Sequence, residues 1–99
     1  MYSSIFKINI EITTGCKNIK EKRNILKSMF TRLRQKFNIS ISEISQHKSL
    51  SMATIVIAYI TNDSKNDEIV IHKIIRTIET LRPDLIILNI ITDSIKIEN

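Results

Sequence analysis

The chain has few side chains that could carry out covalent or metal chemistry. It contains one cysteine, Cys16, and two histidines, His47 and His72, with no second His or Cys at the spacing of a metal site. Cys16 lies just ahead of an expected helix start, where a thiol pKa can be lowered, but it has no partner His or resolving Cys. His72 is expected on the exposed side of a helix. The sequence therefore predicts no bound metal and no catalytic nucleophile.

The remaining residues form no other candidate catalytic site. The acidic residues form no pair typical of a general acid and base, and most are explained as helix caps and surface charges. The chain also lacks a phosphate-binding glycine loop, a Cys-x-x-Cys pair and a serine in a tight glycine-flanked turn. We therefore predict that the protein is not an enzyme, binds no cofactor and has no evident small-molecule substrate.

The most suggestive pattern is a row of cations. Fifteen Lys and Arg against ten Asp and Glu give a net charge of +5, which favours an anionic partner such as nucleic acid. At about 100° per residue, one sector of the helix expected from residue 19 holds Lys20, Arg23, Lys27 and Arg34. Such a row could follow successive phosphates. The alternative is a solvated helix flank, with a charge that reflects only the heavy use of Lys, Ile and Asn.

The elements that position these residues follow from periodicity. Apolar residues alternate over 6–12, and β-branched and aromatic residues dominate 53–60, which predicts two strands. Asn18 and Glu21 have capping-box spacing ahead of an apolar stripe that ends at Phe37. Three further elements are expected: a bulged strand over 39–46, a helix that follows caps at 62–64 and stops at Pro83, and a strand over 85–97.

The order strand, helix, strand, strand, helix, strand predicts an α+β, ferredoxin-like fold. Right-handed crossovers place both helices on one face of a four-stranded antiparallel sheet. The acylphosphatases share this topology, but their Gly-rich anion loop and its Arg are missing here. We expect one domain over residues 1–99, because the length suits a single core and no linker interrupts it.

Location and self-association are also predicted. No apolar run reaches the roughly 18 residues of a spanning helix, no signal peptide is evident, and the single cysteine favours a reducing compartment, so we expect a cytoplasmic protein that does not enter membranes. Both alternation sets are apolar at 55–60 and 85–91, which predicts a homodimer or higher self-association through the open sheet face. Base stacking on that sheet is not expected, because the strands offer only Phe6 and Tyr59.

The stretch Asn-Ile-Lys-Glu-Lys-Arg from Asn18, continued by residues 32–43, resembles the YlxP-like family of small bacterial proteins of unknown function. The resemblance covers nearly the whole chain and implies the ferredoxin-like fold without an established activity. Genes of this family often lie beside those for a translation initiation factor and a ribosome-binding factor, which implies a role near the ribosome. Relatives usually carry Ser in place of Asn18, and an acidic residue followed by Trp-Gln-Arg where this chain has Lys48, Leu50, Ser51 and Met52.

The leading hypothesis is a non-enzymatic accessory factor that contacts structured RNA or the ribosome through Lys20, Arg23, Lys27 and Arg34. The alternative is a structural or regulatory module that associates with further copies through its open sheet face and binds no nucleic acid. His47 and Lys48, in the loop before the third strand, are interpreted as surface residues of a polar turn rather than as part of the row.

Overall fold

Four strands and two α-helices alternate along the chain in the computed structural model, which describes residues 1–98. The order confirms the ferredoxin-like arrangement that the periodicity predicted. The elements are β1 (Tyr2–Ile12), α1 (Ile19–Lys36), β2 (Ser40–Ser45), β3 (Met52–Thr61), the short 3-10 turn η1 (Ser64–Asn66), α2 (Asp67–Leu81) and β4 (Leu85–Lys96).

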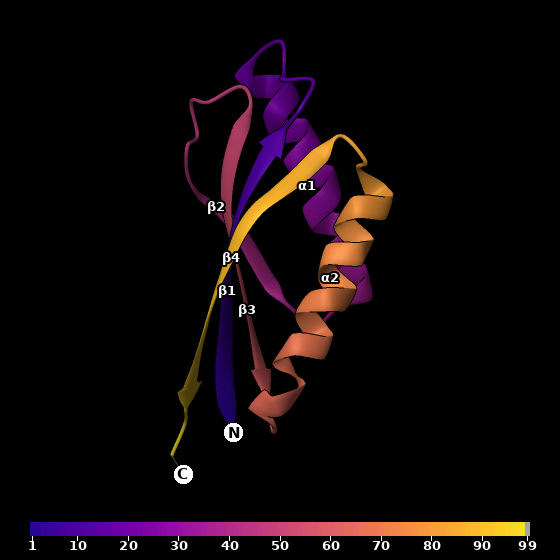
Figure 1. Cartoon of the computed structure of the whole chain (residues 1–99). Helices are drawn as coiled ribbons and strands as arrows, with labels where there is room; N and C mark the ends of the chain where they lie inside the picture. The colour runs from indigo at the N-terminus through magenta and orange to yellow at the C-terminus, as the bar shows by residue number, and fades with distance from the viewer. Residues whose placement is uncertain (99) are drawn as a thin grey trace.

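The sheet is antiparallel throughout, and its strand order is β2-β3-β1-β4. Both helices cover one face, and over residues 1–98 no further layer covers the other face (Figure 1). The β2–β3 register shifts between Glu43 and Ser45, which confirms the predicted interruption of the second strand. A second shift, in the β1–β4 pairing after Asn9, leaves Leu88 without a partner residue.

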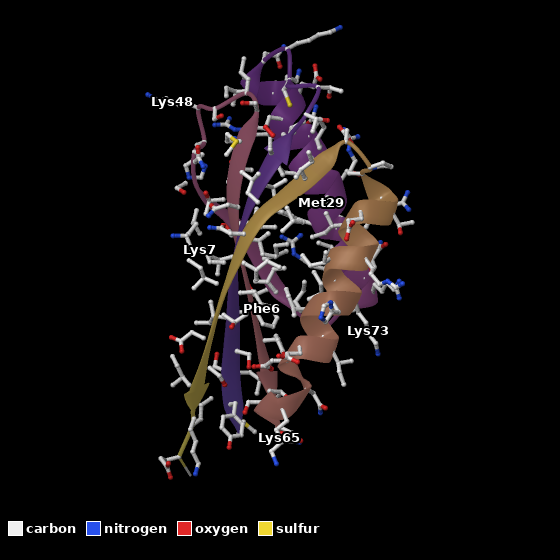
Figure 2. All side chains as sticks on the ribbon, in the orientation of Figure 1. Phe6, Lys7, Met29, Lys48, Lys65 and Lys73 are labelled. Carbon is white, nitrogen blue, oxygen red and sulfur yellow. The ribbon has the colours of Figure 1, made fainter. Side chains whose placement is uncertain are left out.

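Alternation along β1 explains why the helices lie on one face. Phe6, Ile8 and Ile10 are buried, whereas Lys7 is exposed and projects from the opposite side of the sheet (Figure 2). The two helices complete the core with residues at helical spacing: Leu26, Met29 and Leu33 from α1, and Ile71, Ile74 and Ile78 from α2.

The two helices begin in different ways. Asn18 caps α1, because its side-chain oxygen accepts a hydrogen bond from the Glu21 amide at 2.8 Å. The predicted caps at 62–64 start η1 rather than α2. Asp67, the first residue of α2, instead accepts hydrogen bonds from Ser4 and Tyr59 of the sheet. Burial and then the hydrogen bond to Asp67 raise the pKa of Tyr59 well above its usual range.

One cation of α1 lies in the core, which the sequence did not suggest. Lys22 is only 1 % exposed, and its ammonium lies 2.9 Å from the Glu43 carboxylate of β2. It also donates to the Gln46 carbonyl at 2.6 Å, where the chain leaves β2 with a positive φ of 63°. His47 lies 3.2 Å from the other Glu43 oxygen. The Lys22–Glu43 pair therefore ties α1 to the edge strand of the sheet.

Replacement of Glu43 by Ala should destabilise the fold strongly, because it leaves the buried Lys22 ammonium without its carboxylate. We expect a loss of about 3 kcal/mol, the lower end for a broken buried ion pair, since Glu43 keeps some contact with solvent. Adding Lys22→Met should recover most of that loss, because it removes the unpaired charge at nearly the same volume. Urea denaturation of the single and double variants measures both effects. If Glu43→Ala lowered the free energy of unfolding equally in the wild-type protein and in Lys22→Met, the pair would not couple α1 to β2.

Candidate nucleic-acid interface

Helix α1 holds most of the protein's excess charge. It carries seven Lys and Arg residues and one acidic residue, Glu21, a net charge of +6 against +5 for the whole chain. Lys22 is buried and paired, so its charge is not available to a ligand. The other six cations are exposed to solvent: Lys20, Arg23, Lys27, Arg32, Arg34 and Lys36. The outer side of α1 is therefore the most positive surface that one element of this chain presents.

The four cations predicted to form a row do not share one hollow; three of them do. Arg23, Lys27 and Arg34 line a shallow hollow of about 170 Å³ between α1 and the β2 edge, together with Leu26, Phe30 and Glu43, the carboxylate that pairs with Lys22. Lys20 lines a different hollow at the start of α1, where Arg82 also lies. We call Lys20, Arg23, Lys27 and Arg34 the basic flank.

The members of the basic flank differ in how free they are to bind a ligand. Arg34 donates to the Ile41 carbonyl of β2 at 3.3 Å, and its guanidinium carbon lies 6.0 Å from the centre of the Phe30 ring. Arg23 and Lys27 form no ion pair within 4 Å with any residue that the structure describes. Arg23 and Lys27 are therefore free to contact a phosphate, and the Glu43 carboxylate of the same hollow is paired with Lys22, whereas Arg34 also fastens α1 to the sheet edge.

The sequence reasoning missed a second group of cations between the two helices. Arg32 and Lys36 of α1 and Lys73 and Arg76 of α2 line one hollow of about 640 Å³. Their signal was present in the sequence, because each helix places Lys or Arg beside its apolar stripe. Bringing them together requires knowledge of how the helices pack, which helical spacing within one element does not give.

Comparison with known proteins identifies the family. Residues 4–91 match the model of the family described as "Protein of unknown function (DUF503)". The chain belongs to this family. The matched range includes all of α1 and α2.

Two further similarities agree with this assignment. The chain is 32% identical over 63 residues to the uncharacterized protein YlxP of Bacillus subtilis, which covers 64% of this chain and 68% of that protein. Among solved structures it is similar to the de novo designed protein Foldit4, with a TM-score of 0.54, 12% identity, and coverage of 97% of this chain and 99% of that chain. The first supports the predicted YlxP-like family, and the second shows the fold alone.

The other candidate residues are placed as follows. Cys16 is half-buried, and burial, followed by the nearby Glu21 charge, raises the pKa of its thiol. Its position just ahead of α1 therefore does not give Cys16 the lowered pKa of a reactive thiol. His72 is exposed, as predicted, and Lys48 is exposed in the β2–β3 loop.

Residues 1–98 contain neither a metal-ligating cluster nor a helix that could span a membrane. No three side chains among their His, Cys, Asp and Glu residues are grouped so that they could hold a metal ion. Over the same part of the chain, neither helix is both long and apolar enough to cross a membrane.

Proposed function

We propose that this member of the family is a non-enzymatic accessory factor that binds structured RNA, free or in the ribosome, through the basic flank of α1. The observation that carries the proposal is the charge of α1, which has six exposed cations and a single acidic residue. Core packing of α1 uses its buried apolar stripe and not these charges, with the exception of Arg34, which also donates to the Ile41 carbonyl of β2. The gene neighbourhood implied by the YlxP-like resemblance points in the same direction.

The geometry favours recognition of phosphates rather than bases. A helix of 18 residues is about 27 Å long, so cations along it can meet several phosphates of one RNA strand. Base stacking on the sheet has no support, because Phe6 and Tyr59 face the helices and pack against each other with ring centres 5.6 Å apart. Contacts to phosphates position a protein without reading sequence, so we expect little sequence specificity.

Arg23→Gln/Lys27→Gln should weaken binding to a structured RNA by a similar factor whatever its sequence. Each phosphate contact contributes about −0.7 to −0.9 to the slope of log affinity against log salt concentration, so the double variant should flatten that slope by about one to two. Fluorescence anisotropy over a salt series measures affinity and slope together. Stability should change little, because both side chains are exposed.

The matched control is Lys7→Gln/Lys96→Gln, which also removes two positive charges, but from exposed positions of β1 and β4. It should leave most of the affinity and the salt slope in place. Equal weakening by the two double variants would mean that net charge alone attracts RNA, and unchanged affinity in the folded flank variant would refute the basic flank as the site.

A second candidate function is favoured by the open sheet face. The register places Ile60, Ile91 and Ile95 on this face, and they are 58%, 55% and 53% exposed. The face also carries one central cation, Lys7, and one acidic residue near it, Asp93. A second copy packed on this face would cover the isoleucines, and Lys7 and Asp93 offer it opposite charges with which to pair. The occupant we propose for this face is therefore a second copy of the chain.

Sedimentation should then detect a dimer that Ile91→Glu dissociates, because the interface would have to bury an unpaired carboxylate. Ile69→Glu is a matched control, since Ile69 is also 55% exposed but lies on α2. It should leave the dimer intact. A wild-type chain that stays monomeric at high micromolar concentration, or equal effects of the two substitutions, would exclude this interface.

A further inference from the structure

We propose that the hollow between α1 and α2, which we call the helix groove, is a binding site for a nucleotide. Its volume of about 640 Å³ lies within the range of small-molecule sites. Its lining combines charged, polar and apolar side chains: Arg32, Lys36, Lys73 and Arg76, then Thr77 and Thr80, then Phe37 and Leu81. None of these belongs to the basic flank, so the inference does not require that the flank binds RNA.

The four cations of the groove make it a site for multiple negative charges. Arg32 and Lys36 approach from α1, Lys73 and Arg76 approach from α2, and no acidic residue lines the hollow. None of the four has a carboxylate within 4 Å among residues 1–98. Like charges brought together repel one another, and an anion between the helices would relieve that repulsion. The two guanidinium groups can each hold two phosphate oxygens.

Helix α2 turns its basic side toward α1. At about 100° per residue, Lys73, Arg76 and Thr77 fall within one arc of about 100°, and the acidic residues Glu68 and Glu79 fall outside that arc. Lys73 projects from α2 away from the sheet, so its ammonium is accessible to a ligand (Figure 2). The charge of the groove is thus a property of both helices rather than an extension of the basic flank.

The hydroxyls in the groove add a second requirement. Thr77 donates to the Lys73 carbonyl at 2.8 Å, and Thr80 donates to the Arg76 carbonyl at 2.8 Å. Because both hydroxyl protons are used within the helix, the two oxygens can only accept hydrogen bonds from a ligand. A suitable ligand therefore carries donors as well as negative charge.

The apolar residues of the groove indicate a third part of the ligand. Phe37 and Leu81 form part of the lining and suit an uncharged ring. A nucleotide meets all three requirements. Its phosphates would contact the cations, its ribose hydroxyls or a base amino group would donate to the threonine oxygens, and its base would pack against the apolar wall. The same chemistry is offered by a free nucleotide and by the terminal nucleotide of an RNA chain.

Calorimetric titration with adenosine triphosphate tests the site directly. Lys73→Gln/Arg76→Gln should weaken binding at least about tenfold, since each lost charged hydrogen bond is worth that order. Arg32→Gln/Lys36→Gln, which alters only α1, should weaken it to a similar degree. The control Arg23→Gln/Lys27→Gln removes two charges from the basic flank and should keep the affinity.

Three outcomes would overturn the proposal: no binding of adenosine triphosphate, binding that both groove variants leave intact, or equal affinity for inorganic tripolyphosphate, which would leave the ring and the donors without a role. An RNA that carries a 5′-triphosphate and displaces adenosine triphosphate would assign the site to an RNA end. Failure of that RNA to compete would assign it to the free nucleotide. Loss of RNA binding in the flank variant alone tests the proposed function separately from this site.

Discussion

Two helices pack on a single face of the sheet, and this one-sided burial determines the character of the remaining surfaces. The alternating residues of β1 and β3 that face the helices form the core, and burying each large apolar side chain contributes about 1.5–3 kcal/mol. The helices must therefore turn their polar sides outward, and on α1 the exposed charged residues are cations. The opposite face of the sheet keeps exposed isoleucines and no covering layer. The proposed binding of anions and the proposed pairing with a second copy consequently belong to opposite sides of one molecule.

The Lys22–Glu43 pair sets the position of α1 on that sheet. It joins the first turns of the helix to β2, and the bond from Arg34 to the Ile41 carbonyl joins the last turns to the same strand. With the helix held at both ends, Arg23 and Lys27 face solvent beside the β2 edge, and Arg32 faces α2. The split of the α1 cations between the basic flank and the helix groove follows from this orientation.

The fold was accessible from the sequence because its signals are local. Alternation in β1, the Asn18 cap and the stop before Pro83 each depend on neighbouring residues, and the observed elements agree with them to within a few positions. Lys22 was not recognised as buried, because a lysine on a helix normally faces water and its partner lies 21 positions further along the chain. The composition of the helix groove was missed for the same reason. Both depend on tertiary packing, which helical and strand spacing do not contain.

The central claim is that the helical layer, and not the sheet face, is the surface that contacts nucleic acid. Chemical-shift mapping of the backbone amides during titration with a structured RNA tests it in one measurement. The account predicts changes concentrated on α1 around Arg23 and Lys27, with little effect at Lys7 and Ile91 of the open face. Changes confined to the strands of the open face, or no change at any amide at low salt, would contradict it.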